Sequence, residues 1–195
     1  MARIVNDQPD KERAEEILAA AFDNNRSVNA VVRQDRHRQE RIRSLMAYAL
    51  DMAALSGSAF LSENREACAV LSYPHLKKPS LRSAWLDLRL VIRAIGISGI
   101  ARTLEREKLI AAVKPKTAMA YLWFIGTDPS YQRRGAGSEL LREVLDFTDA
   151  RKLPVYLETS LPENVRWYER FGFETYHELR LGYTLYCLKR QPVNE

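Results

Sequence analysis

The sequence is poor in cysteine, with only Cys68 and Cys187 among its 195 residues. Two cysteines cannot build a disulfide framework, and both lie in apolar runs, so we expect buried free thiols and a reducing cytoplasm. The N-terminus lacks an apolar signal region. The most apolar stretch, residues 85–100, is interrupted by charged side chains and is too short to span a bilayer. The cysteines and the three histidines show no metal-ligand spacing, so we expect no metal site.

The chain also lacks a large excess of one charge sign. The chain has 30 Lys and Arg against 25 Asp and Glu, a net charge of +5 that is spread along its length. This charge fits an anionic ligand and permits nucleic acid without requiring it. The hydrophobic fraction of 46% and the charged fraction of 28% exclude wholesale disorder and fibrous repeats. The length and the lack of linker composition predict one domain over residues 1–195.

Hydrophobic spacing predicts helices and strands that alternate along much of the chain. Helices are predicted at residues 10–22, 34–55, 138–150 and 163–170. Strands are predicted at residues 59–61, 67–73, 118–127, 154–158, 173–179 and 183–189. A segment at 79–116 interrupts this order with two further helices, at 83–95 and 97–113, and is interpreted as a helical insertion. The order predicts an α/β (α+β) fold.

The loop between the predicted strand at 118–127 and the predicted helix at 138–150 indicates an anion site. It contains two arginines and two glycines: Arg133, Arg134, Gly135 and Gly137. A helix N-terminus offers unpaired amides, glycines let a phosphate approach the backbone, and arginines add cationic donors. The loop lacks the lysine of a P-loop, and Leu140 stands where a dinucleotide fingerprint needs its third glycine. Both of those phosphate sites are therefore disfavoured.

Two runs of the sequence resemble the motifs of a known family. Residues 121–141 run from Tyr-Leu-Trp-Phe-Ile-Gly-Thr-Asp-Pro through Gln-Arg-Arg-Gly-Ala-Gly to Leu-Leu. They resemble motif A of the GNAT superfamily of acetyl-CoA-dependent N-acetyltransferases. Residues 156–174, which end in Tyr-Glu-Arg-Phe-Gly-Phe-Glu, resemble its motif B. The resemblance implies a mixed, twisted central sheet flanked by helices, with acetyl-CoA as the co-substrate.

The resemblance also implies the cofactor contacts. The strand end at Ile125, Gly126 and Thr127 would splay from its neighbour at a bulge and pair with the pantetheine arm. The pyrophosphate would be held by the loop and its amides, at Gln132, Arg133, Arg134, Gly135, Ala136, Gly137 and Ser138. Asn164 would contact the cofactor arm, and Tyr168 would lie near the sulfur of the cofactor.

The catalytic groups are less evident. Many family members carry a glutamate on the central strand, whereas residues 118–127 contain only Tyr121 as an ionisable side chain. Glu158, at the end of a strand, is a candidate general base and equally a salt-bridged or solvated carboxylate. Tyr168 is a candidate general acid for the leaving thiolate, and its alternative is a core tyrosine. His75 is expected in solvent rather than at the acceptor.

The apolar stripe of the insertion has two interpretations. Trp85 and residues 86–95 fit a hydrophobic acceptor pocket, but helix-core packing is the simpler expectation. A membrane-surface helix is disfavoured because the polar face of this segment is narrow.

The sequence therefore predicts an N-acetyltransferase that moves an acetyl group directly from acetyl-CoA to an amine, a small molecule rather than a protein. One alternative is a non-catalytic CoA-binding or CoA-sensing module, and another is an acetyltransferase of charged tRNA. We expect no membrane contact and no nucleic-acid partner, and we leave a homodimer open. The acceptor pocket is expected from residues 20–116.

Overall fold

A computed structural model describes residues 1–193. The helices are α1 (Gln8–Ala21), α2 (Arg26–Val31), α3 (Arg38–Ser56), α4 (Leu81–Leu90), α5 (Ile100–Val113), α6 (Ala136–Asp149) and α7 (Pro162–Glu169). The strands are β1 (Arg3–Ile4), β2 (Gly57–Leu61), β3 (Ala67–Ser72), β4 (Ala120–Thr127), β5 (Val155–Thr159), β6 (Glu174–Arg180) and β7 (Thr184–Arg190). All the predicted strands and helices exist, whereas β1 and α2 were not predicted.

The predicted helix at 34–55 is wrong at its start, because α3 begins at Arg38. Residues 26–31 form the separate helix α2, whose first turn is capped by the side chain of Asn25, 3.1 Å from the amide of Val28. Asp35 then accepts a hydrogen bond from the amide of His37 at 3.0 Å and stops any continuous helix.

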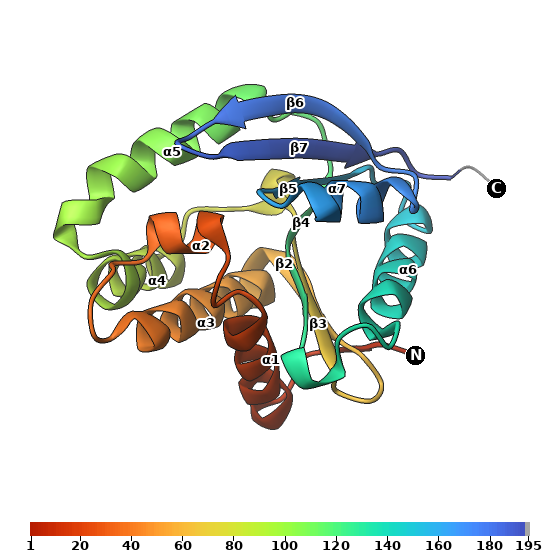
Figure 1. Cartoon of the computed structure of the whole chain (residues 1–195), viewed down its shortest axis with the longest axis horizontal. Helices are drawn as coiled ribbons and strands as arrows, with labels where there is room; N and C mark the ends of the chain where they lie inside the picture. The colour runs from red at the N-terminus through yellow and green to blue at the C-terminus, as the bar shows by residue number, and fades with distance from the viewer. Residues whose placement is uncertain (194–195) are drawn as a thin grey trace.

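Seven strands form one mixed sheet in the order β1-β2-β3-β4-β5-β7-β6. Every neighbouring pair is antiparallel except β4 and β5, which are parallel. Figure 1 shows β3 and β4 running down the molecule while β7 and β6 cross above them. The predicted α/β fold with a mixed sheet flanked by helices is confirmed.

The parallel pair opens into a gap. Ala120 pairs with Val155 and Tyr121 with Tyr156, and no further residues of β4 and β5 pair within the described chain. A bulge contributes to this divergence, because Trp123 is an extra residue of β4 opposite β3. The C-terminal halves of β4 and β5 are therefore splayed, and each leaves backbone groups free toward the other.

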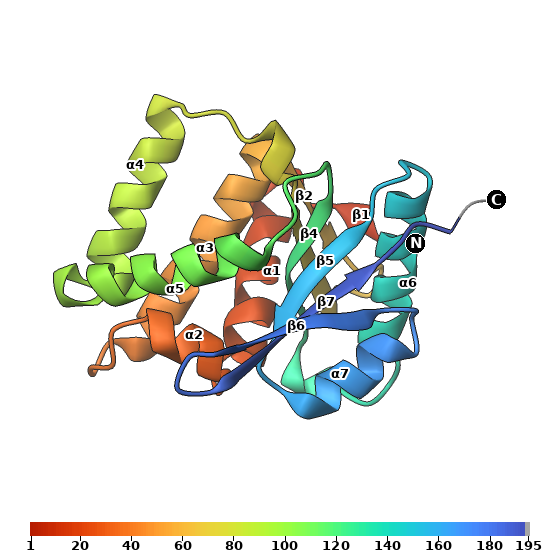
Figure 2. The ribbon, with the colours of Figure 1, turned by 90° about the horizontal axis from the view of Figure 1, so that it is seen from above.

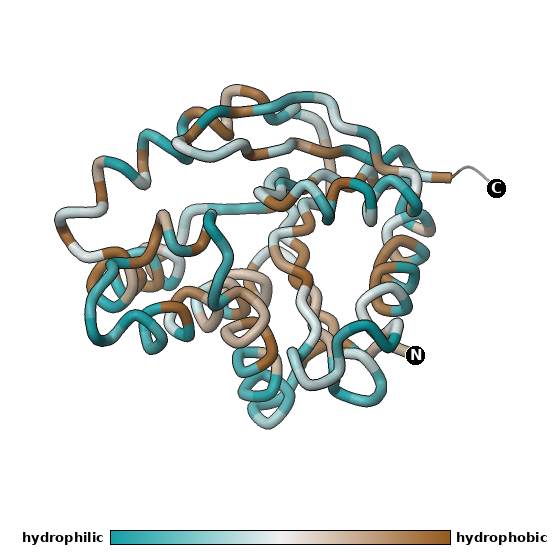
Figure 3. Tube along the Cα trace, viewed as in Figure 1, coloured by the Kyte–Doolittle hydropathy of each residue, from teal (hydrophilic) through white to brown (hydrophobic). Residues whose placement is uncertain are grey.

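Two hydrophobic cores lie on opposite faces of the sheet. Helices α1 and α3 pack on one face, with Ile17, Met46 and Phe124 among the buried residues. Helices α6 and α7 cover the other face, with Leu140 and Leu157 among them. In Figure 3 the coil of α6 alternates between hydrophobic and hydrophilic residues, as expected for a helix with one buried side.

The helical insertion projects beside the sheet and returns to it through α5. Arg106 of α5 donates to Ser27 Oγ at 2.5 Å and to the Tyr183 hydroxyl at 3.3 Å, which joins α5 to α2 and to the β6–β7 turn. Helix α4 packs on α3 with Leu86 buried. The expectation that Trp85 packs in a helix core is wrong, because Trp85 is 58% exposed.

The two cysteine thiols are free and buried, as predicted. Burial and the nearby Glu158 carboxylate raise the pKa of Cys187 to about 12, and burial raises that of Cys68 as well. Among residues 1–193, no helix combines the length and apolar character needed to cross a membrane.

Candidate active site

The end of β4 forms one wall of the gap. Ile125, Gly126 and Thr127 pair with β3 on one side and have no strand partner on the other. Such an edge can accept an extended ligand as an added strand. Gly126 is also required by packing, because a Cβ there would lie 2.7 Å from the Cβ of Ala21 in α1. The predicted splay at a bulge is thus confirmed.

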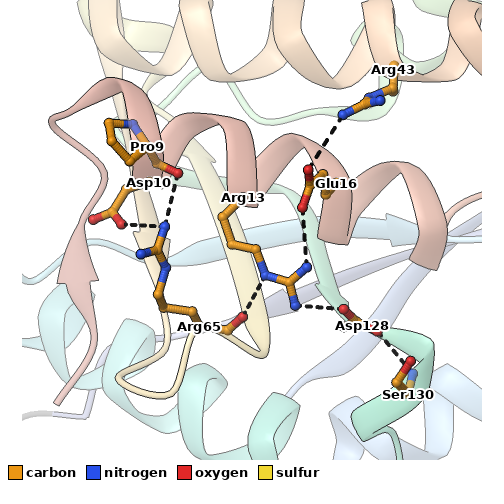
Figure 4. Close-up of polar contacts among 8 residues, drawn as sticks. All are labelled: Pro9, Asp10, Arg13, Glu16, Arg43, Arg65, Asp128 and Ser130. Carbon is orange, nitrogen blue, oxygen red and sulfur yellow. Dashed lines mark hydrogen bonds and ion pairs between the residues drawn. The ribbon is translucent and has the colours of Figure 1, made fainter.

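The loop after β4 is held in place by α1. Arg13 reaches the carboxylate of Asp128 at 2.6 Å, and the Asp128 amide donates to the carbonyl of Glu66 at 2.8 Å. The amide of Ser130, 3.0 Å from Asp128 Oδ1, and the Arg13 guanidinium hold the pKa of Asp128 below its usual value. Figure 4 shows the contacts of Asp128 with Arg13 and Ser130. The loop therefore starts from a fixed, charged anchor.

Arg13 also joins this anchor to the β2–β3 turn. Its Nε donates to the carbonyl of Arg65 at 3.1 Å, and its Nη1 lies 3.4 Å from Glu16 (Figure 4). Arg65 in turn donates to the carbonyl of Pro9 at 3.0 Å. Sequence reasoning missed Arg13, because its contacts with Arg65 and Asp128 each span more than fifty residues and no motif includes it.

The N-terminus of α6 is shaped for an anion. Gly135 is its N-cap in the left-handed region, with φ of +92°, and Arg133 also has a positive φ of 63°. A Cβ on Gly135 would meet no atom within 4 Å, whereas one on Gly137 would lie 2.8 Å from Thr127 Oγ1. Gly137 thus lets the helix approach β4, and Gly135 faces open space. Helix α6 begins at Ala136, two residues before the prediction.

Backbone donors point out of this helix end. The first helical bonds run from the amides of Ser138 and Glu139 to the carbonyl of Gly135, so the preceding amides of Ala136 and Gly137 have no helical acceptor. Arg133 and Arg134 are exposed beside them. Gln132 is turned back toward β4, with Nε2 3.5 Å from the carbonyl of Thr127. The structure brings the predicted phosphate loop next to the splayed end of β4.

Helix α7 closes the gap from the β5 side. Asn164 Nδ2 lies 3.5 Å from Thr159 Oγ1 at the end of β5. Trp167 Nε1 donates to Ser138 Oγ at 3.0 Å and joins α7 to the first turn of α6. The buried Ser160 Oγ has no hydrogen-bond partner within residues 1–193. A buried hydroxyl of this kind needs an acceptor or donor from elsewhere, so the end of β5 fits a polar ligand.

Tyr168 lies in the core beneath α7. Its ring is 6% exposed and packs 5.4 Å from the ring of Phe173, centroid to centroid, and 4.7 Å from that of Trp167. Burial raises the pKa of its phenol, so the hydroxyl is protonated at neutral pH. The same residue therefore packs the helix against the sheet and retains a proton.

Glu158 occupies the point at which β4 and β5 begin to diverge. It lies two residues beyond Tyr156, the last residue of β5 that pairs with β4. Its side chain is 5% exposed, accepts a hydrogen bond from the Tyr121 hydroxyl and lies 3.5 Å from Nζ of Lys114. The structure thus makes it an ion-paired carboxylate. Its Oε1 has no hydrogen-bond partner within the described residues.

The neighbours of Glu158 come from distant parts of the chain. Lys114 follows α5, and burial lowers the pKa of its amine, although Glu158 opposes that shift. Burial, together with the Glu158 charge, raises the pKa of Tyr121 well above its usual value. Sequence reasoning identified Tyr121 as the ionisable residue of β4 but missed Lys114, which the insertion brings in.

His75 lies away from this gap. It is exposed, and its Nδ1 accepts a hydrogen bond from the amide of Met119 at 3.3 Å, before the first residue of β4. Its predicted solvent exposure is confirmed. Across residues 1–193, no three His, Cys, Asp or Glu side chains gather in a way that could hold a metal ion.

A splayed parallel strand pair thus lies beside a glycine-bounded helix N-terminus. The sequence profile of the Acetyltransferase (GNAT) family matches residues 66–173, which span β3 to α7 and therefore this whole site. The chain belongs to this acetyltransferase family.

Individual relatives are more distant. A mycothiol acetyltransferase from Acidimicrobium ferrooxidans is 35% identical over 72 residues, a match that spans 35% of this chain and 23% of that protein. A crystal structure of a histone acetyltransferase and related acetyltransferase from Corynebacterium glutamicum is 20% identical, with a TM-score of 0.75 over 100% of this chain and 97% of that one. A mosquito arylalkylamine N-acetyltransferase-like protein is 13% identical, with a TM-score of 0.63 over 98% and 99%. The structural likenesses show a shared fold alone.

Proposed function

We propose that this chain is an acetyl-CoA-dependent N-acetyltransferase that transfers the acetyl group directly to the amine of a small molecule. The observation that carries the proposal is the juxtaposition of the open β4–β5 gap with the unpaired amides of the α6 N-terminus. Acetyl-CoA fits this shape, because it combines an extended pantetheine arm with a pyrophosphate. The arm would lie along Ile125–Thr127, with Asn164 opposite, and residues 132–138 would hold the pyrophosphate.

Direct transfer is supported by the state of the two thiols. Their raised pKa values keep both cysteines protonated at neutral pH, and both are buried. A protonated, inaccessible thiol is a poor nucleophile, so a covalent acyl-cysteine step has no support. Both buried thiols also fit a reducing cytoplasm, which is the compartment we propose.

The reaction has simple requirements. A C–N bond forms between the acetyl carbon and the amine, the C–S bond to CoA breaks, and the amine loses one proton. In this proposal Glu158 accepts that proton at Oε1, which lies 3.5 Å from Nζ of Lys114 and has no hydrogen-bond partner in the described chain, while the Tyr121 hydroxyl holds Oε2. Tyr168, whose phenol is protonated, supplies a proton to the departing thiolate.

The test is a thiol-release assay with a panel of amines, followed by mass spectrometry of the products. Amine-dependent release of CoA thiol, with acetylated amine as the product, supports the proposal. Binding of acetyl-CoA without transfer to any amine would instead indicate a CoA-binding module. Transfer only to aminoacyl-tRNA, included as one arm of the panel, would contradict the small-molecule acceptor.

A further inference from the structure

Helix α4 has two apolar sides, of which the protein covers one. Leu86 is buried against the rest of the molecule, and in the π-helical turn that follows α4 (Val91–Ile95), Ala94 and Ile95 are buried as well. The opposite side carries four large apolar residues, Leu81, Trp85, Leu88 and Ile92, here called the outer stripe. Their exposed fractions are 93%, 58%, 57% and 66%. Spacings of four, three and four residues place them on one helical face.

The outer stripe lies at the periphery of the molecule. Figure 2 shows α4 at the edge far from α6 and the C-terminus, with α3 and α5 on its inner side. Ile97, in the turn after it, is 87% exposed and extends the apolar surface. Monomeric proteins rarely leave large apolar side chains clustered in water, so this surface requires an occupant.

Basic side chains border the stripe. Residues 77–93 contain five Lys and Arg and one Asp, a net charge of +4. The acid, Asp87, is engaged, since it accepts a hydrogen bond from the Tyr48 hydroxyl at 2.7 Å. Within the described chain, Lys77, Lys78, Arg82 and Arg93 form no salt bridge. Arg89 lies 3.8 Å from the carboxylate of Asp51 and over the Trp85 ring at 5.6 Å. At about 100° per residue, Arg82, Arg89 and Arg93 follow one flank of the stripe.

We propose that the outer stripe of α4 and its basic flank dock on an anionic lipid surface. An exposed face of Trp, Leu and Ile bordered by Lys and Arg is the composition of a helix that lies in the membrane interface. Trp85 supplies the amphipathic ring that favours the headgroup level. The polar face of this segment is narrow because α4 has a second apolar side, which packs on α3.

Charge disfavours a second copy of this chain as the occupant. Two copies facing each other through the stripe would each bring a net charge of +4 over residues 77–93, and like charges at an interface repel. An anionic lipid surface complements the same charge, with each nearby Lys or Arg strengthening binding roughly fivefold. Docking does not depend on acetyl transfer, so it is tested separately from the proposed function.

The experiment measures sedimentation of the full chain with vesicles. One set is pure phosphatidylcholine, and the other contains phosphatidylcholine with phosphatidylglycerol. The docking proposal predicts binding to the anionic vesicles that weakens with salt, together with a blue shift of tryptophan fluorescence that Trp85→Phe removes. The double variant Trp85→Ser/Leu88→Ser and the triple variant Lys77→Gln/Lys78→Gln/Arg82→Gln should each lose binding.

Control variants alter exposed side chains elsewhere in the same numbers. Ile4→Ser/Leu109→Ser removes two exposed apolar residues, and Arg166→Gln/Arg170→Gln/Arg180→Gln removes three exposed charges. Both controls should bind vesicles like the unaltered protein. Absence of vesicle binding, or equal binding to both vesicle types, would overturn the proposal. So would a dimer in light scattering that Trp85→Ser/Leu88→Ser converts to a monomer.

Discussion

Tyr168 packs in the core beneath α7, and its hydroxyl donates no hydrogen bond to a protein group within residues 1–193. Tyr168→Phe keeps the ring in the core and removes only the hydroxyl, which forms no hydrogen bond in the described chain. We expect kcat to fall by at least ~10-fold, as for loss of a general acid. Acetyl-CoA affinity and melting temperature should stay nearly unchanged. Tyr73→Phe, at a buried tyrosine of the same core, is the control and should keep full activity.

If Tyr168 serves packing alone, Tyr168→Phe will retain kcat. Steady-state kinetics with calorimetric titration of acetyl-CoA distinguishes the two roles, because a packing defect lowers stability and activity together.

Glu158 is an ion-paired carboxylate. A single and a double variant can distinguish its proposed role as a base from its ion pair with Lys114. Glu158→Gln should lower kcat about 10²–10⁴-fold and also destabilise the fold, because Lys114 loses its partner in a buried place. The double variant Glu158→Gln/Lys114→Gln removes both charges. It should recover stability in thermal melting without recovering activity. Recovery of activity in the double variant would show that Glu158 only neutralises Lys114.

The first turn of α6 depends on the empty space above Gly135. Asn and Asp both tolerate its positive φ better than other side chains do, so Gly135→Asn and Gly135→Asp form a matched pair that differs in charge. We expect the aspartate to weaken acetyl-CoA binding at least ~10-fold more than the asparagine does, about 1.4 kcal/mol. Calorimetric titration measures both affinities. Equal affinities for the two variants would show that no phosphate lies at this helix end.

The other end of α6 is tied to β7. Arg190 binds Asp149 with both nitrogens, at 2.7 and 2.8 Å, and holds the pKa of that carboxyl below its usual value. A lowered pKa means that the pair contributes stability above about pH 4 and loses it as the pH falls through the folded-state pKa. Asp149→Asn should therefore cost about 1–3 kcal/mol at neutral pH, and the deficit should shrink in acid.

Urea unfolding of Asp149→Asn across pH checks this expectation. Asp146→Asn, at an exposed residue of the same helix, is the control and should match the unaltered protein. A deficit that is constant with pH would mean that the carboxylate charge contributes nothing.

Across the whole molecule, local sequence patterns predicted the helices, strands and turns that local interactions determine. The strand β4, the helix α6 and the glycines between them follow from hydrophobic periodicity and helix-end chemistry, and each appears within two residues of its expected bounds. The break between α2 and α3 was missed because it depends on side-chain contacts around Asp35 and Arg38. Arg38 reaches Asp23 at 2.8 Å, and Arg41 reaches Asp35 at 2.7 Å. Helical spacing alone cannot reveal such contacts.

The candidate site likewise contains residues that the sequence could place and residues that it could not. Residues 125–138 could be placed from the motif, because one strand, one loop and one helix are consecutive in the chain. Lys114 could not, since its contact with Glu158 spans 44 residues and depends on how the insertion returns to the sheet. The exposure of Trp85 was missed for a related reason. Spacing shows that a face is apolar, but only the fold shows which of two apolar faces is covered.

The central claim is that the β4–β5 gap and the α6 N-terminus together bind acetyl-CoA. Amide hydrogen exchange measured with and without saturating acetyl-CoA tests it most directly, because the claim concerns backbone groups. We predict slower exchange over residues 125–127 and 133–138, with no change over α4, and a weaker effect from NADH or ATP. Unchanged exchange in both segments, or protection confined to other parts of the chain, would contradict this account.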